Sequence, residues 1–233
     1  MCGRFALVTP GAELAAALGL DQVPTNLKAR ANIAPTQEVP VLPNLPVRRL
    51  EEYRWGLIPS WAKEKGIGNR MINARAETVA VKPAFKDALR RRRCLVPADG
   101  FYEWKAAGGK AKIPHFIRLR SHRPLAFAGL WESWQPRGSG AESGEAAVRS
   151  FTILTCAPNA LMRTLHERMP VILPPAAYAR WLDPAPLEPA ELLPLLVPFP
   201  AEALEAYPVS LAVNNPRNQG AELMQPTSSP TPG

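Results

Sequence analysis

Proline constrains the fold of this chain more than any other residue, because 27 of its 233 residues are proline and they are spread along the whole chain. Proline lacks a backbone N–H, so it ends helices and is excluded from the centre of a sheet. Helices and strands must therefore be short, and the loops between them numerous.

Short runs rich in β-branched and aromatic residues predict strands, separated by turn residues at close spacing. The expected strands cover residues 3–8, 38–42, 47–55, 93–97, 100–105, 113–120, 124–134 and 150–156. Short helices are expected from Pro10 to the stop at Gly19, and over 83–92, 158–165, 175–182 and 188–196. The pattern predicts an α+β fold with a curved, barrel-like, mainly antiparallel β-sheet core and short flanking helices.

The length of the chain fits one large domain or two small ones. The segment 135–147, rich in Gly, Ser, Ala and Glu, is the best candidate for a mobile loop between two units. Because that segment is short and motifs lie on both sides of it, we expect a single domain over residues 1–225. The tail 226–233 has nothing to bury, which predicts disorder.

Basic residues exceed acidic ones, with 28 Lys and Arg against 20 Asp and Glu and a net charge of +8. This balance favours a polyanionic partner, because each contacted phosphate releases counterions. No run approaches the roughly 18 apolar residues of a membrane span, and the N-terminal segment is too short for a secretory signal. We expect a cytoplasmic protein without a membrane partner, and a monomer.

The three cysteines differ in their chemical prospects. Their distant positions suggest neither a zinc site nor a disulfide framework, so no metal and no cofactor is expected. Cys94 and Cys156 lie in apolar runs, where a thiol usually packs as a small buried hydrophobe. Cys2 is different, because loss of Met1 would give it a free α-amine beside its thiol.

Such a 1,2-aminothiol reacts with an aldehyde in two steps that no internal cysteine can perform. The neutral amine forms an imine, and the sulfur then attacks the same carbon to close a five-membered thiazolidine. The α-amine ordinarily titrates at about 7.7–8.0 and the thiol at about 8.5, so both are usable near neutral pH. The alternative is that cysteine stands at position 2 by accident.

Polar residues in three further segments are candidates for the same site. Asn73 precedes Arg75 in a predicted loop, where an amide can orient an amine and a guanidinium can hold a phosphate. Glu103 shares a strand face with Phe101, opposite Tyr102 and Trp104, and a carboxylate among aromatic rings suits proton transfer. A purely structural alternative stays open for each segment. The segment with Asn73 and Arg75 could be a turn followed by a helix cap, and Glu103 could be an edge-strand glutamate that faces water.

His166 ends a short predicted helix and could shuttle protons, while Arg168 beside it binds phosphate. A helix-terminal histidine that interacts with the helix dipole is the alternative. His115 and His122 fall in a strand and a turn, and we interpret both as structural. Trp61, just after Pro59, is a candidate stacking platform for a base, although burial is equally consistent with the sequence.

Five motifs taken together resemble the SOS response-associated peptidase (SRAP) family of abasic-site processing proteins, and the resemblance extends from Met1 to about Leu223. The motifs are Met-Cys-Gly-Arg-Phe at 1–5, Asn-Ala-Arg-Ala-Glu-Thr at 73–78, Ala-Asp-Gly-Phe-Tyr-Glu-Trp at 98–104, His-Glu-Arg-Met-Pro at 166–170 and Asn-Pro-Arg-Asn at 215–218.

The resemblance implies a role for each candidate residue. Cys2 would crosslink to the aldehyde of an abasic site in single-stranded DNA after Met1 is lost, and Asn73 would position its α-amine. Glu103 and His166 would assist proton transfer. The implied DNA contacts are phosphate binding by Arg4, Arg75, Arg168 and Lys82, and base stacking by Trp61. The protein would be nucleoid-associated when bound to DNA.

Three other functions stay open at this point. An abasic-site lyase would let the imine undergo β-elimination and cut the strand. A thiol peptidase would use Cys2 as nucleophile and His166 as base, either to remove Met1 or to cleave other proteins. A non-covalent single-strand binder would rely on charge and Trp61 alone. Neither of the last two needs cysteine to be at position 2.

Overall fold

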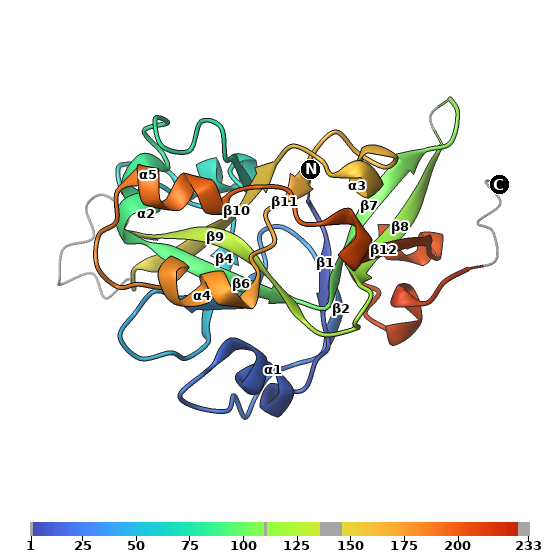
Figure 1. Ribbon diagram of the computed structural model, residues 1–233, viewed down its shortest axis with the longest axis horizontal. Coiled ribbons are helices and arrows are strands. Elements are labelled where there is room, and N and C mark those ends of the chain that lie inside the picture. Colours follow the sequence, from blue (N-terminus) through green and yellow to red (C-terminus); the bar gives the residue numbers. More distant parts are fainter. Residues whose placement is uncertain (1, 110, 136–145, 228–233) are drawn as a thin grey trace.

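The computed structural model describes residues 2–109, 111–135 and 146–227, and its strands form two sheets flanked by short helices (Figure 1). The strands are β1 (Phe5–Leu7), β2 (Arg30–Ile33), β3 (Glu38–Pro43), β4 (Glu51–Trp55), β5 (Asn73–Arg75), β6 (Arg93–Ala98), β7 (Gly100–Ala106), β8 (Lys112–Leu119), β9 (Leu125–Trp134), β10 (Val148–Cys156), β11 (Met169–Pro170) and β12 (Leu204–Pro208). The helices are α1 (Gly11–Leu18), α2 (Lys86–Arg91), α3 (Ala160–Arg163), α4 (Pro175–Trp181) and α5 (Pro189–Leu192).

Five strands close on themselves into a barrel. β10 pairs with β9, β9 with β6, β6 with β3, β3 with β4, and β4 again with β10. Only the β4–β10 contact within this ring is parallel. The far end of β10 leaves the ring and is flanked by β5 on one edge and β11 on the other. The segments carrying Asn73 and His166 therefore approach the same strand from opposite sides.

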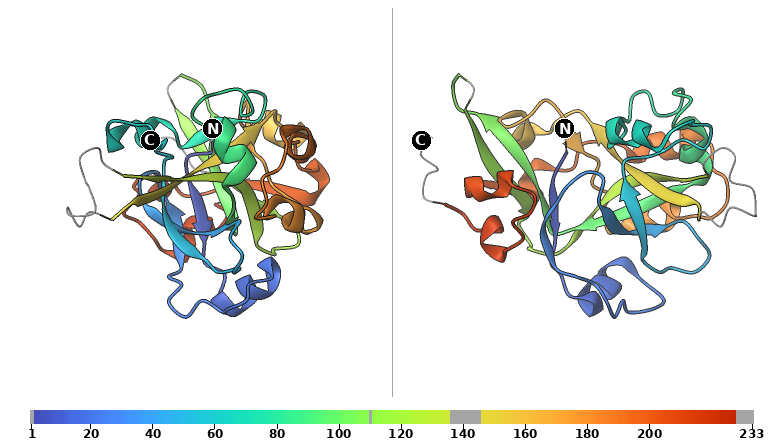
Figure 2. Two further views of the ribbon diagram at one scale, coloured as in Figure 1. Left: turned by 90° about the vertical axis from the view of Figure 1, so that its left-hand side faces the viewer. Right: turned by 180° about the vertical axis from the view of Figure 1, so that it is seen from behind.

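The second sheet is open and antiparallel, in the order β12-β8-β7-β1-β2. It stands beside the barrel, with α1 below it and with α2, α4 and α5 around the barrel (Figures 1 and 2). The chain passes from barrel to sheet between β6 and β7, where only Asp99 separates the two strands. Gly100 is required there, because a Cβ would lie 2.5 Å from the carbonyl oxygen of Ile117.

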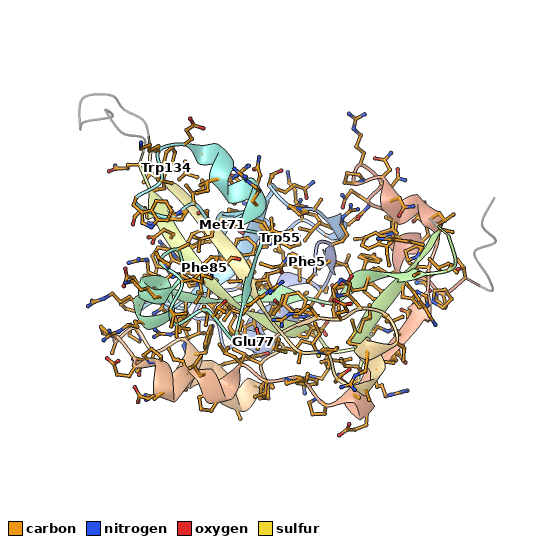
Figure 3. All side chains as sticks on the ribbon, turned by 90° about the horizontal axis from the view of Figure 1, so that it is seen from above. Phe5, Trp55, Met71, Glu77, Phe85 and Trp134 are labelled. Carbon is orange, nitrogen blue, oxygen red and sulfur yellow. The ribbon has the colours of Figure 1, made fainter. Side chains whose placement is uncertain are left out.

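The main core lies inside the barrel and extends to the open sheet. Phe5 of β1 contacts Trp55 of the barrel at a ring separation of 5.1 Å and Phe127 at 5.9 Å, and Figure 3 shows Phe5 beside Trp55 in the interior. A second cluster covers the outer face of the sheet, where the Tyr102 and Phe116 rings lie 4.9 Å apart. The N-terminal strand is thus held between two cores.

The predicted curved, mainly antiparallel core with short helices is confirmed, with differences at individual elements. Gly19 ends α1 in a left-handed conformation with φ of +63°, as expected, but Pro10 caps that helix instead of beginning it. The predicted helix 188–196 stops at Leu192 and continues only as a 3-10 turn, because Pro194 has no N–H to donate. The predicted strand 47–55 forms only from Glu51.

Four strands were not predicted. β2 and β12 are the edge strands of the open sheet. β5 and β11 are short strands that pair with the end of β10, so the loop predicted at Asn73–Arg75 was wrong. Of the predicted loop 135–147, residues 136–145 lie outside the described residues, as do residues 228–233 of the predicted tail. Thr227, near the start of that tail, donates its backbone N–H to the Pro208 carbonyl at 3.0 Å. No helix within the described ranges has the length and apolar character needed to cross a membrane.

Candidate functional site

Cys2 lies where the open sheet meets the barrel, just before β1, and its side chain is fully buried in the main core. Burial raises the pKa of the thiol well above its usual range, and the negative charge of Glu103 raises it further. Both effects favour the neutral thiol over the thiolate. Cys94 and Cys156 are buried free thiols, as predicted.

Asn73, the first residue of β5, fixes the position of residue 2. Its side-chain Nδ2 donates a hydrogen bond of 2.8 Å to the Cys2 carbonyl oxygen. Its Oδ1 is buried and has no hydrogen-bond partner among the described residues. A buried acceptor without a donor is costly, so this amide is suited to receive a further N–H group near Cys2.

Glu103 reaches the site from β7 and is almost completely buried. The predicted alternation of side chains along this strand is confirmed. Phe101, on the same face as Glu103, belongs to the main core, whereas Tyr102 and Trp104 on the opposite face belong to the outer cluster. In the neighbouring strand β8, His115 is the residue opposite Glu103. Burial lowers the pKa of His115, and its Nδ1 lies 3.0 Å from the Ile113 carbonyl.

His166 occupies the loop between α3 and β11. Its backbone N–H donates to Met162 at 2.8 Å, and its imidazole Nδ1 accepts the backbone N–H of Arg168 at 3.0 Å. This loop enters β11, whose Pro170 pairs with Thr155 of β10, while β5 pairs with the other edge of β10. The imidazole is half-buried, as a proton shuttle in contact with solvent requires.

The four predicted phosphate-binding cations fall into two groups. Arg75 and Lys82 are exposed. Arg4 is anchored inside, because its Nη1 donates to the Asn32 side chain and to the Val213 carbonyl, both at 2.7 Å. Arg168 is also engaged, in an ion pair with Glu77. Arg75 and Lys82 are thus the more accessible cations for a polyanion. Arg4 and Arg168 also stabilise the fold through their contacts within the protein.

Trp61 is 52% exposed and lines an open pocket with Lys63, Ile67 and Arg70. This exposure is what a stacking platform needs. Trp55, in contrast, is fully buried and donates its indole N–H to the Ile72 carbonyl.

Two residues of this region were not singled out in the sequence. Asn32 is fully buried and joins Arg4 to the carbonyls of Val213, Asn215 and Asn218. A polar residue inside the apolar run 31–34 was the only signal for it. Glu77 pairs with Arg168 across 91 positions of sequence, a distance that no local pattern spans.

Comparisons with known proteins agree on one family. A family model described as "SOS response associated peptidase (SRAP)" matches residues 1–216. The chain is 43% identical to abasic site processing protein YoqW of Bacillus subtilis over 229 residues, covering 97% of this chain and 99% of that protein. It is 34% identical to abasic site processing protein HMCES of Gallus gallus, covering 77% of this chain and 58% of that protein.

A crystal structure of a protein from Bacteroides thetaiotaomicron has the same fold. It superimposes with a TM-score of 0.84 at 26% sequence identity, covering 97% of this chain and 100% of the other. The family match covers nearly the whole chain and includes every candidate site residue. This chain belongs to the SOS response associated peptidase (SRAP) family.

Proposed function

We propose that this protein, freed of Met1, binds single-stranded DNA and captures abasic sites as a covalent thiazolidine through Cys2. The observation that carries the proposal is the environment of Cys2. Asn73 holds the Cys2 carbonyl with its Nδ2 and keeps a buried Oδ1 free to accept a hydrogen bond. The α-amine of Cys2 is a suitable donor for that atom. The names of the relatives, abasic site processing proteins, favour the same substrate.

The chemistry proceeds through two bond-forming steps. The neutral α-amine attacks the abasic aldehyde carbon, and loss of one water gives an imine. The thiol sulfur then attacks the imine carbon, and the thiol proton passes to the nitrogen as the ring closes. Glu103 relays that proton in this proposal, because its negative charge opposes thiolate formation and taking up the proton removes that charge. His166 supplies and removes protons at the amine during loss of water.

The DNA contacts follow from exposure and charge. Arg75 and Lys82 bind phosphates beside the lesion, and the remaining N–H groups of Arg4 and Arg168 complete the contact. Trp61 stacks on a neighbouring base, which favours unpaired DNA over a continuous duplex. Removal of Met1 is autocatalytic in this proposal. The Cys2 thiol attacks the Met1 carbonyl carbon, the C–N bond breaks to free the Cys2 amine, and one water hydrolyses the resulting thioester to release methionine and the thiol.

Denaturing gel electrophoresis tests the proposal directly. The mature protein is incubated with single-stranded DNA carrying one abasic site, and its N-terminus is verified by mass spectrometry. We expect a shifted band that survives heat and detergent, and no such band with intact DNA or with abasic DNA whose aldehyde has been reduced to an alcohol. A band of equal intensity with the reduced DNA would contradict aldehyde capture, and absence of any band would favour the peptidase.

Replacing Asn73 with alanine is expected to slow adduct formation about tenfold or more, because the α-amine loses its acceptor and residue 2 loses its anchor. The rate of band appearance at saturating DNA measures this effect. The affinity for intact single-stranded DNA, measured by fluorescence anisotropy, should stay near the wild-type value. An unchanged rate would show that Asn73 does not orient the amine.

The lyase alternative gives a separate expectation. In the wild-type protein, fast attack by sulfur should remove the imine before β-elimination can cut the strand. A Cys2→Ala protein whose Met1 has been removed by a methionine aminopeptidase keeps the α-amine of residue 2 but lacks the sulfur, so it should release more cleaved DNA than the wild type. Denaturing gels of end-labelled DNA measure the cleaved fraction, and equal cleavage by the two proteins would rule out this suppression.

A further inference from the structure

Glu77 is a residue of the 73–78 motif to which the proposed function gives no task. Its carboxylate lies in the turn after β5 and is 51% exposed. Both of its oxygens accept hydrogen bonds from Arg168, Oε1 from Nη1 at 2.6 Å and Oε2 from Nη2 at 2.9 Å. Bidentate carboxylate–guanidinium pairs fix geometry better than other surface ion pairs. The position of Glu77 is labelled in Figure 3.

Arg168 is held on its other side by β10. Its Nη2 also donates to the Thr155 backbone carbonyl at 2.6 Å and lies 3.3 Å from the Thr155 hydroxyl. The Arg168 side chain is consequently only 18% exposed. The hydrogen bond from Arg168 lowers the pKa of Glu77, so the pair stays ionised at neutral pH. One side chain thus connects the turn after β5 to β10 and to the loop before β11.

The backbone of Arg168 acts on His166. Its N–H donates to the imidazole Nδ1 at 3.0 Å, which places the proton of the neutral ring on Nε2. The Arg168 carbonyl lies 3.3 Å from the same Nδ1 and can accept a proton-bearing nitrogen when the ring is charged. The peptide groups of residue 168 therefore support both protonation states of His166.

These contacts form a chain from Glu77 through Arg168 to His166. We propose that Glu77 is a positioning residue, which holds the Arg168 segment in place and thereby sets the orientation and tautomer of the His166 imidazole. This inference rests on the proposed aldehyde capture, in which His166 moves protons. Glu77 touches neither the substrate nor the reacting atoms, so its effect reaches the reaction only through the loop.

The matched control is Glu167→Gln. Glu167 is exposed in the same loop, so Glu77→Gln and Glu167→Gln each remove one negative charge near the DNA. Both substitutions should raise the affinity for intact single-stranded DNA by about two- to threefold at low salt, because a repelling carboxylate is gone. Only Glu77→Gln should release the His166 loop.

The experiment compares the three mature proteins in two measurements. Single-turnover adduct formation at saturating abasic DNA is expected to slow about tenfold in Glu77→Gln and to stay at the wild-type rate in Glu167→Gln. The imidazole ¹⁵N signals of His166, assigned with a His166→Gln sample, are expected to move toward the values of mixed tautomers only in Glu77→Gln. If Glu77→Gln does not fold, Glu77→Asp takes its place, with the same direction and a smaller effect.

The two variants test only the positioning role of Glu77, because adduct formation by the wild-type protein tests the proposed function separately. Slower adduct formation with altered ¹⁵N signals in Glu77→Gln supports the positioning role. If Glu77→Gln and Glu167→Gln have equal rates, or if the His166 signals of Glu77→Gln match the wild type, Glu77 does not position His166.

Discussion

A Cys2→Ala protein, freed of Met1 by a methionine aminopeptidase, is expected to form no heat-resistant adduct with abasic single-stranded DNA. Its α-amine can still make an imine, but without sulfur the ring cannot close, and the imine hydrolyses when the sample is denatured. The loss should be complete on a gel. Burial raises the pKa of the wild-type thiol, so the thiol is still protonated at neutral pH. Ring closure in the wild type should therefore accelerate as pH rises, because loss of the thiol proton, which Glu103 takes up, becomes easier.

Two controls separate the thiol from the amine and from other cysteines. Inserting one serine between Met1 and Cys2 keeps the thiol but moves the free amine to another residue, and this protein should also form no adduct. Cys156→Ala removes a buried thiol distant from the N-terminus in sequence and should crosslink like the wild type. An adduct that survives heating in Cys2→Ala would show that another nucleophile captures the aldehyde.

An Arg93→Met protein is expected to be the least stable of the single variants considered. Arg93 is fully buried at the start of β6, and its guanidinium donates to five backbone carbonyls. Those of Leu89 and Arg90 belong to the last turn of α2, that of Trp181 to the end of α4, and those of Asp183 and Ala185 to the loop beyond. One side chain thus terminates two helices against the barrel.

Burial lowers the pKa of Arg93 to about 10, so the side chain keeps its charge at neutral pH. Methionine has similar length but no donor, which leaves the five carbonyls without this partner. The free energy of unfolding should fall by about 3–5 kcal/mol. For a chain of this size that loss corresponds to roughly 10 °C in Tm.

Arg91→Met is the matched control, because Arg91 is exposed two residues earlier and the same atoms are exchanged. Its effect should remain within about 0.5 kcal/mol. Urea unfolding followed by tryptophan fluorescence compares the two variants with the wild type. Equal midpoints for Arg91→Met and Arg93→Met would mean that the carbonyls find other donors.

The sequence predicted the type of fold because proline spacing and strand alternation are local properties. Both act over a few residues, and they correctly assign Gly19 as a helix stop and Glu103 to the face of Phe101. Edge strands such as β2 and β12 escaped prediction, because a strand with one partner needs no continuous apolar pattern.

The candidate site was predictable only as a set of motifs. The structure connects Asn73 to Cys2 by a hydrogen bond and Glu103 to the Cys2 thiol by its charge. The ion pair of Glu77 with Arg168 forms because β5 and β11 both pair with β10. The sequence alone does not show this strand pairing. The internal partners of Arg4 were hidden for the same reason.

The anchor of Arg4 has a consequence for the order in which the site is assembled during folding. The guanidinium of Arg4, two residues after Cys2, is held by the carbonyl of Val213 and by Asn32, whose own partners include Asn215 and Asn218. Residues close to Cys2 are therefore fixed by residues about 209 positions later in the sequence. If Cys2 captures aldehydes as proposed, its surroundings are complete only after the segment 213–218 has folded against Asn32 and Arg4.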